Sequence, residues 1–459
     1  MAQPLLSLAR LLEASAARGR SIGMAYRSLL FDDCARATCL GGNLERLEGR
    51  SIILMPGSQL KAAAALIELD GWARRLVLCP PDLEPGRLGA VIRDSDADAL
   101  VYDGDGPAPA ETGLKALAPC ALPLQPRSAA VASRLATEWA MLTSGTTGDP
   151  KMVVHTLRTL TGAIDEERAG SPAQNWATMY DIRRYGGLQI FLRAIKGRGS
   201  LTLRNHGESL DDFLVRAGRS EVTHISGTPS HWRLVLMSPA SRRIDPEYIR
   251  LSGEIADASL LDALSSHYPR ARIAHAFAST EAGVAFEVDD GQPGFPAAFL
   301  GERGSGVAIK LVDGLLAIRS PCTALRFLGK DAPDLRDREG FVDTGDMIER
   351  RGERCYFLGR RGGIINVGGA KVNPEKVEAV INQHASVLAS LVKARKNPIT
   401  GAVVVADVVL KDGVVATPTL KDEIIRACER QLAPYEAPAL LRFVPALPVT
   451  ASGKLVRDA

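Results

Sequence analysis

The 459-residue sequence lacks the features that mark several classes of protein. Its formal net charge is only +3, so it has neither the basic surplus typical of nucleic-acid-binding proteins nor the charge of an electrostatic membrane anchor. No run approaches the ~20 apolar residues that a membrane-spanning helix needs. Residues 1–20 contain no uninterrupted apolar segment of signal-peptide length. The sequence therefore predicts a cytoplasmic protein with no membrane span and no nucleic-acid partner.

Cysteine is sparse and scattered in this sequence. The seven cysteines are odd in number and form no Cys-x-x-Cys pair, which is the spacing typical of zinc and redox sites. We therefore expect buried or idle thiols in a reducing compartment. Internal repeats and low-complexity tracts are also absent. The composition is that of ordinary globular domains, and the length predicts about two to four compact units.

Short apolar runs alternate with amphipathic segments along much of the chain. We expect strands at 51–55, 75–78 and 99–102 and helices at 60–69 and 210–219, and such alternation is typical of a parallel sheet covered by helices. From about residue 311 the pattern changes to strands and turns, at 315–318 and 355–358. Helices at 374–381 and 420–432 and strands at 389–393 and 402–410 indicate a small α+β unit. The Pro- and Ala-rich stretch 107–126 is expected to link elements.

A run of small residues between two predicted strands carries the clearest chemical signal. It reads Thr143, Ser144, Gly145, Thr146, Thr147, Gly148, Asp149, Pro150, Lys151. Backbone N–H groups and hydroxyls of such a run can converge on a polyphosphate, and the lysine adds a positive charge. The order of residues differs from the Gly-x-x-x-x-Gly-Lys-Ser/Thr loop of P-loop NTPases. Alone, the run predicts nucleotide binding, and the alternative is a Ser/Gly-rich surface loop.

Five further motifs follow in order. They are Phe277-Ala278-Ser279-Thr280-Glu281, Asp343-Thr344-Gly345-Asp346, Gly359-Arg360, Gly368-Gly369-Ala370-Lys371-Val372-Asn373-Pro374, and Pro448-Val449-Thr450-Ala451-Ser452-Gly453-Lys454. Each is weak alone, because a Ser-Thr-Glu string can cap a helix and an Asp-Gly pair is usually a turn. Together with the phosphate loop they resemble the signature of the adenylate-forming superfamily, in its acyl- and aryl-CoA synthetase (AMP-dependent synthetase and ligase) branch.

The resemblance implies the residues of an adenylation site that uses ATP and Mg²⁺. Lys454, Thr280 and Glu281 would be catalytic, with Lys454 at the carboxylate and α-phosphate, Thr280 at phosphate and Glu281 on magnesium. A hard cation prefers carboxylate oxygen, and a lysine offsets the charge that builds as two anions meet. The residues implied to bind ATP or AMP are Thr143, Ser144, Gly145, Thr146, Thr147, Gly148, Lys151, Gly253, Glu254, Phe277, Ala278, Ser279, Asp346 and Arg360.

The resemblance also implies an acid pocket and a tunnel for coenzyme A. The pocket residues are Tyr180, Arg184, Tyr185, Gly186 and His275, and Gly368 and Gly369 would let the pantetheine arm pass. Arg184 stands where CoA ligases commonly carry His, and it could pair with a second acidic group on the substrate or with a neighbouring carboxylate. Asp181 echoes the aspartate that binds the α-amino group in amino-acid-activating domains, but the Gly186-Gly187-Leu188 register favours the CoA ligases.

The implied fold is α/β: a large N-terminal domain of stacked mixed or parallel sheets with helices, residues 1–360, followed by a smaller, mobile α+β domain, residues 361–459. The segment before the phosphate loop is short for the family, so the N-terminal subdomain is expected to be trimmed. A hinge is expected near 361–362, with Gly362 where the family usually has Asp or Lys.

The predicted reaction is ATP-dependent activation of a carboxylic acid to acyl-AMP with release of pyrophosphate, and transfer of the acyl group to coenzyme A. A phosphopantetheinyl acyl or peptidyl carrier protein, or an amine, is an alternative acceptor. A second alternative is a non-catalytic nucleotide- or adenylate-binding relative. The acid itself stays open, and the chain is expected to be a monomer or homodimer.

Overall fold

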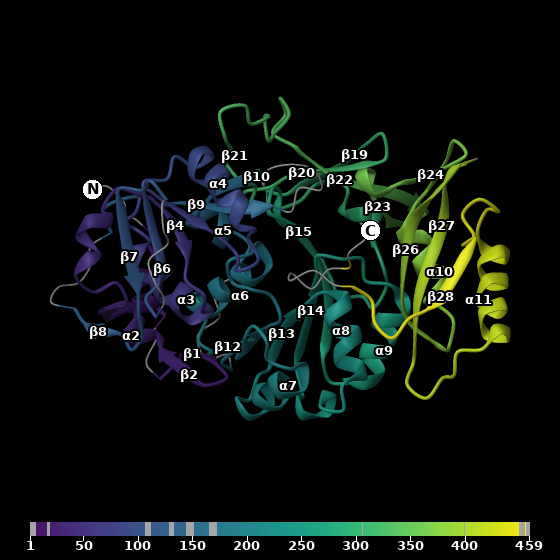
Figure 1. The fold of residues 1–459 in the computed structure, drawn as a ribbon, viewed down its shortest axis with the longest axis horizontal. Helices are drawn as coiled ribbons and strands as arrows, with labels where there is room; N and C mark the ends of the chain where they lie inside the picture. Colours follow the sequence, from purple (N-terminus) through teal and green to yellow (C-terminus); the bar gives the residue numbers. More distant parts are fainter. Residues whose placement is uncertain are drawn as a thin grey trace.

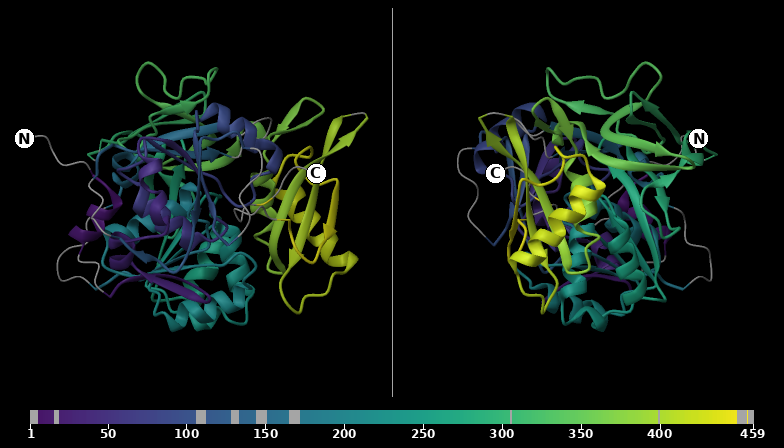
Figure 2. Two further views of the ribbon diagram at one scale, coloured as in Figure 1. Left: turned by 60° about the vertical axis from the view of Figure 1, so that its left-hand side comes forward. Right: turned by 90° about the vertical axis from the view of Figure 1, so that its right-hand side faces the viewer.

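The computed structural model of the chain describes residues 6–15, 19–105, 112–127, 133–143, 151–164, 172–304, 306–398, 400–448 and Leu455. They form a large N-terminal part, built on three sheets, and a smaller C-terminal part beside it (Figures 1 and 2). The elements from α1 to β23 belong to the large part, and those from β24 to β28 form the yellow-green layer at the right of Figure 1.

The first sheet is mostly parallel and carries the predicted strands. Its seven strands, in spatial order, are β21 (Arg326–Leu328), β10 (Lys151–Thr156), β9 (Glu138–Thr143), β5 (Arg75–Leu78), β4 (Ser51–Met55), β6 (Ala99–Asp103) and β7 (Ala116–Cys120). Strands β4 and β5 are apolar and almost wholly buried, because parallel strands are covered on both faces. Helix α3 (Gln59–Leu69) follows β4, and helix α4 (Leu88–Asp94) precedes β6.

The second sheet has eight strands. Their spatial order is β16 (Gly283–Val288), β15 (Arg272–Ser279), β14 (Tyr248–Ser252), β13 (His224–Gly227), β11 (Trp176–Thr178), β12 (Leu201–Leu203), β1 (Ser21–Met24) and β2 (Arg27–Leu30). Helix α6 (Tyr185–Lys196) shares one hydrophobic core with α3 and with residues of both sheets. Helices α7 (Leu210–Arg219), α8 (Pro229–Met237) and α9 (Ala258–His267) pack on the other face of the second sheet. The α6 face of this sheet is where the candidate site forms.

A third sheet is antiparallel and joins the second through β15 and β16. It contains β17 (Phe295–Pro296), β23 (Arg354–Arg360), β22 (Val342–Arg351), β20 (Leu315–Arg319), β19 (Ala308–Val312) and β18 (Gly301–Glu302). The remaining described elements of the large part are α1 (Leu8–Ala14), α2 (Phe31–Arg36), β3 (Ala37–Thr38), β8 (Gln125–Pro126), α5 (Leu157–Thr161) and short 3₁₀ turns.

The C-terminal part has its own hydrophobic core, whose residues all lie between Ile365 and Phe443. Its elements are β24 (Ile365–Val367), β25 (Ala370–Val372), α10 (Pro374–Ile381), β26 (Val387–Asn397), β27 (Gly401–Leu410), α11 (Pro418–Gln431) and β28 (Leu440–Phe443). Few polar contacts reach the large part: Arg233 of α8 donates to the Leu388 carbonyl at 2.9 Å, and Asn382 donates to Asp257 at 3.4 Å.

The predicted α/β class is confirmed, and so are most predicted elements. The interpretation of 107–126 as a linker is wrong, because this stretch contains β7 and β8. Strand β7 tolerates Pro119 because it lies at the edge of its sheet, where a missing N–H breaks no ladder. All seven cysteines are free and buried. Over the described ranges, no helix is both long enough and apolar enough to span a membrane.

Candidate active site

Strands β9 and β10 form the hairpin that carries the predicted phosphate loop. Thr143 and Lys151 pair across it, and the Thr143 hydroxyl donates to the Lys151 carbonyl at 3.4 Å. The exposed Lys151 ammonium lies 5.8 Å from the ring centre of Phe327. Ser144, Gly145, Thr146, Thr147 and Gly148 lie outside the described residues, so their predicted role stays a prediction.

The turn between β15 and β16 carries Thr280 and Glu281, and it is held from several sides. The Ser279 hydroxyl accepts from the Ala282 N–H at 2.9 Å, and the Glu281 carbonyl accepts from the Ala324 N–H at 3.0 Å. Gly283 has φ +76°, and a Cβ there would lie 2.3 Å from the Cys322 carbonyl oxygen. The turn therefore requires glycine at that position, and its backbone is fixed before any ligand binds.

His155 ties this turn to the strand that follows the phosphate loop. The imidazole is completely buried, its Nε2 lies 2.7 Å from the Thr280 carbonyl oxygen, and its Nδ1 lies 2.9 Å from the Thr159 hydroxyl oxygen. Burial lowers the His155 pKa to about 4, so the ring is neutral near pH 7, donating to Thr280 through Nε2 and accepting from Thr159 through Nδ1. The packing of His155 therefore positions the Thr280 carbonyl.

Replacing His155 with alanine is expected to lower pyrophosphate release about tenfold per folded molecule. The Thr280 carbonyl would lose its partner, and an unpaired polar group costs about 1–3 kcal/mol, enough to shift the Thr280–Glu281 turn. The measurement is the steady-state rate of pyrophosphate release, normalised to the folded fraction from thermal unfolding. An unchanged normalised rate would mean that His155 contributes to packing alone.

Phe277 belongs to an aromatic cluster rather than standing alone. Its ring stacks on Phe286 and on Phe357 of β23, both at 5.5 Å between ring centres, with interplanar angles of 18° and 5°. Phe286 and Phe357 each contact Phe295 in turn. The cluster joins the second sheet to the third, so it fixes the distance between the Thr280 turn and strands β22 and β23.

Asp346 and Arg360 face each other across strands β22 and β23. They are register partners, and Arg360 Nε donates to Asp346 Oδ1 at 3.2 Å. The Asp346 N–H in turn donates to the Thr344 hydroxyl at 3.2 Å, and Gly345 takes a φ of +71° in this turn. The Asp346 side chain is 14% exposed. The structure thus brings together two residues that the sequence placed fourteen positions apart.

The turn at Gly253 and Glu254 meets the end of the chain. One Glu254 carboxylate oxygen accepts from the Ser230 N–H at 2.9 Å, and the other accepts from the Leu455 N–H at 3.1 Å. Leu455 directly follows Lys454, which lies outside the described residues. Glu254 therefore connects the C-terminal segment to the rim of the candidate site.

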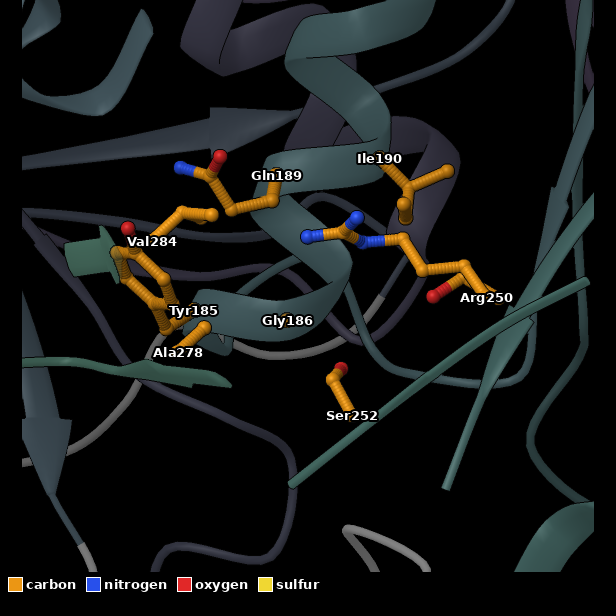
Figure 3. A pocket seen from close by; sticks show the side chains of 9 residues that line it. Tyr185, Gly186, Gln189, Ile190, Arg250, Ser252, Ala278 and Val284 are labelled. Carbon is orange, nitrogen blue, oxygen red and sulfur yellow. The ribbon is translucent and has the colours of Figure 1, made fainter. Parts of the chain in front are cut away.

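A small cavity lies between helix α6 and the second sheet (Figure 3). Its walls are Tyr185, Gly186, Gln189 and Ile190 from α6 and Ser226, Arg250, Ser252, Ala278 and Val284 from strands β13–β16. Its volume of about 10 Å³ is the room of about one water molecule. Tyr180 holds two wall residues in place, because its ring packs on Gly186 and its hydroxyl donates to the Ser252 carbonyl at 2.7 Å. Burial raises the pKa of the Tyr180 hydroxyl, which keeps the group neutral.

Two predicted pocket residues lie elsewhere. Arg184 forms an ion pair with Asp82 at 2.5 Å, and it is not among the described residues that line the cavity. His275 lies on the β15 face opposite Ala274 and Ala276, and its Nε2 is 3.0 Å from the Gln292 carbonyl oxygen. Burial lowers the His275 pKa.

Sequence reasoning missed Gln189, Ile190, Ser226, Arg250 and Val284. On α6, residues 185, 186, 189 and 190 share a helical face, so a Tyr-Gly start at residue 185 already pointed to Gln189 one turn later. Arg250 also left a signal, because it is a charged residue inside the largely apolar strand Tyr248–Ser252. Ser226 and Val284 carry no sequence signal of their own.

Gly368 and Gly369 form a two-residue turn between β24 and β25. Their φ values are +58° and +88°, as a type I′ hairpin turn requires, and the Gly368 N–H donates to the Thr400 carbonyl at 2.9 Å. Both glycines are exposed. The turn thus gives a local reason for two glycines, and passage of a pantetheine arm stays a prediction.

Glu281 suits the magnesium role that the motif implies. Mg²⁺ usually takes one or two protein carboxylates and completes its shell with phosphates and water. In the part of the chain that the structure describes, no group of three or more His, Cys, Asp and Glu residues could hold a metal ion. A half-buried, single carboxylate beside the Thr280 turn therefore fits a cation shared with a nucleotide.

The chain matches two related families of known proteins. Residues 74–318 match the family described as AMP-binding enzyme, and residues 376–454 match its partner family, AMP-binding enzyme C-terminal domain. A 2-succinylbenzoate–CoA ligase from Salmonella typhimurium is 26% identical over 386 residues, which cover 81% of this chain and 79% of that protein. A 4-hydroxybutyrate–CoA ligase of Metallosphaera sedula is 24% identical and covers 69% of this chain and 60% of that protein.

Solved structures share the fold over nearly the whole chain. The anthranilate CoA ligase AuaEII, in complex with anthranoyl-AMP, superimposes with a TM-score of 0.80 at 18% identity, covering 99% of this chain and 96% of that one. At this identity the likeness is one of fold. The match to a two-part enzyme fold agrees with the two parts seen in Figures 1 and 2.

Proposed function

Because the chain belongs to the AMP-binding enzyme family, we propose that it is an AMP-forming acid–CoA ligase. It would activate a carboxylic acid with ATP to an acyl-adenylate and pyrophosphate, and then transfer the acyl group to the thiol of coenzyme A. The names of its relatives, which include CoA ligases of several acids, support this reaction. The seven free, buried thiols support a place in the reducing cytoplasm.

One observation carries the proposal. Ser252 lines the small cavity, and Glu254, two residues further on, holds the backbone N–H of Leu455. Leu455, which directly follows the predicted catalytic lysine, therefore lies near the rim of this cavity, which α6 lines on one side and strands β13–β16 line on the other. An acid bound beside this cavity would meet the Lys454 segment and the Thr280 turn from two sides.

In the first step a carboxylate oxygen of the acid attacks the α-phosphorus of ATP, and pyrophosphate leaves. Lys454 would offset the charge of the two anions, and Asp346, braced by Arg360, would hold the ribose. Magnesium, held by Glu281 and the phosphates, would supply charge neutralisation. The Thr280 hydroxyl would donate to a phosphate oxygen from a turn that His155 fixes.

In the second step the thiol of coenzyme A attacks the acyl carbonyl and AMP leaves. We propose that residues 361–459 form the mobile domain, which rotates about 361–362 and replaces Lys454 with the Gly368–Gly369 turn. Gly362 is exposed, and a Cβ there would meet no atom within 4 Å. Such a rotation would break the contacts of Arg233 with Leu388, of Asn382 with Asp257 and of Leu455 with Glu254.

Pyrophosphate release with a broad panel of carboxylic acids tests this function. We expect release that requires ATP, Mg²⁺ and an acid, and a thioester when free coenzyme A is added. Release without a thioester from free coenzyme A, but with one from a holo-carrier protein or an amide from an amine, would contradict coenzyme A as acceptor. ATP binding without release for any acid would contradict catalysis and identify a nucleotide-binding relative.

A further inference from the structure

Arg250 is a buried cation in the wall of the small cavity. It lies in the middle of strand β14 and is 4% exposed. Figure 3 shows its guanidinium pointing across the cavity toward Gln189 of α6. A charge in such a place requires a partner, because an unpaired buried ion is costly.

The hydrogen-bond partners of Arg250 contact only the Nη1 atom of its guanidinium. Nη1 forms the ion pair with Glu287 of β16 and lies 3.4 Å from the Tyr248 hydroxyl. Among the described residues, Nε and Nη2 make no hydrogen bond. These two nitrogens form the side of the guanidinium that binds a carboxylate with two parallel hydrogen bonds. Nε and Nη2 of Arg250 therefore have no hydrogen-bond acceptor among the described residues, and this edge of the guanidinium faces the cavity.

The space beyond Arg250 is larger and positively charged. A second cavity of about 470 Å³ shares Arg250 and Val284 with the first, and the two cavities therefore meet at this side chain. Its walls include Arg193 and Arg272 and one carboxylate, Glu287, which pairs with Arg250 and lies 3.6 Å from Arg272. Among the described wall residues there are thus three arginines and one carboxylate, and Arg272 also pairs with Asp289 at 3.0 Å.

Aromatic and neutral groups complete the larger cavity. Trp176, His224 and Tyr248 line it, with Arg193 5.8 Å from the Trp176 ring and Arg272 4.3 Å from the Tyr248 ring. Burial and the two neighbouring arginines lower the His224 pKa to about 4, so His224 adds no charge near pH 7. The walls suit an organic group that ends in an anion.

We propose that the activated acid is a dicarboxylic acid, whose second carboxylate binds the Nε and Nη2 edge of Arg250 while its first carboxylate reacts with ATP. This inference rests on the proposed function and names its substrate class. Arg250 becomes the residue that determines specificity. A neutral distal group would leave the free edge of a buried guanidinium without an acceptor, and such a loss separates substrates more sharply than shape alone.

The position of Arg184 explains why it does not take this role. Both Asp82 oxygens lie near Arg184 Nη2, at 2.5 and 2.6 Å, so its guanidinium is held by a carboxylate of the chain. The pair is also more exposed than Arg250, with 22% of the Arg184 side chain accessible. Of the two arginines, Arg250 is the one with a buried, open edge.

The test compares diacids with their half-esters in pyrophosphate release by the wild-type protein. Succinic, glutaric, adipic and homophthalic acids are each paired with the monomethyl ester, which keeps one carboxylate to activate and removes the second charge. We expect kcat/KM to favour at least one diacid over its half-ester by roughly 10- to 100-fold, the size of a two-pronged charged hydrogen bond. Equal kcat/KM within every pair would overturn the proposal.

A matched pair of variants locates the effect. In Arg250→Met the ratio of diacid to half-ester is expected to fall to about one, while the KM for ATP stays unchanged. Arg219→Met removes the same charge from an exposed position on α7 and is expected to keep the wild-type ratio. A wild-type ratio in folded Arg250→Met would overturn the role of Arg250. Should Arg250→Met not fold, the wild-type comparison decides alone.

The two levels of the account fail differently in this experiment. If half-esters or monocarboxylic acids support pyrophosphate release as well as diacids do, the proposed dicarboxylic substrate is refuted. The proposed acid–CoA ligase activity is then unaffected. ATP binding with no release for any acid of either kind would refute the proposed function itself.

Discussion

Replacing Lys454 with alanine is expected to slow acyl-adenylate formation by about 10²- to 10³-fold, while thioester formation from supplied acyl-AMP stays within about twofold. The reason is electrostatic. In the first half-reaction a carboxylate approaches a polyphosphate, and a cation placed at that point stabilises the charge of the transition state. In the second half-reaction a thiol attacks a neutral acyl carbonyl, so the same cation contributes little.

The two half-reactions are measured separately for this variant. Pyrophosphate release from ATP and acid reports the first, and appearance of acyl-CoA from chemically prepared acyl-AMP and coenzyme A reports the second. Lys411→Ala, which removes an exposed lysine of the same C-terminal part, serves as the control and is expected to behave as wild type. Equal loss of both half-reactions in Lys454→Ala would contradict the division of labour between the two orientations.

Replacing Asp346 with alanine is expected to raise the KM for ATP about 10- to 100-fold. An aspartate that accepts from both ribose hydroxyls makes two charged hydrogen bonds with a net contribution of about 1.5–3 kcal/mol each, and water that enters in the variant replaces part of this. The Arg360 contact at 3.2 Å orients the carboxylate from the neighbouring strand. Because ground state and transition state share the ribose contacts, the expected change lies in KM more than in kcat.

The control for Asp346→Ala lies on the same strand. Glu349, three residues further along β22, has 44% of its side chain accessible and pairs with Arg351, so Glu349→Ala removes an equal charge without touching the turn. Titration of ATP at saturating acid gives both KM values. An unchanged KM for Asp346→Ala would place the ribose elsewhere and remove strands β22 and β23 from the nucleotide site.

The sequence predicted the features that depend on residues close together in the chain. Strands β4 and β5 are buried on both faces, so they read as apolar runs, and α7 and α10 were predicted with their observed bounds. The motif at 277–281 was visible because its function depends on consecutive residues. Strand β7 was missed because its Pro119 is tolerated at a sheet edge, and position in a sheet is a property of the whole fold.

The small cavity between α6 and the second sheet was predicted only in part, because its wall residues lie far apart in the sequence. Tyr185 and Gly186 were identified from a motif on one helix, whereas Ser226, Arg250 and Val284 come from three strands that lie together only after the sheet forms. An arginine was expected at the acid, but the sequence pointed to Arg184. That side chain is engaged by Asp82, a residue more than a hundred positions away that no motif marked. The roles of Lys454 and of residues 144–148 stay predictions.

The central claim, that this chain joins an acid to coenzyme A through an acyl-adenylate, is tested most directly by mass spectrometry of the reaction. The purified protein is incubated with ATP, Mg²⁺ and the best acid of the panel, first without and then with coenzyme A. The account predicts acyl-AMP and pyrophosphate in the first sample, and acyl-CoA with an equal amount of AMP in the second. Formation of ADP and phosphate, or of acyl-AMP that coenzyme A leaves unchanged, would contradict it.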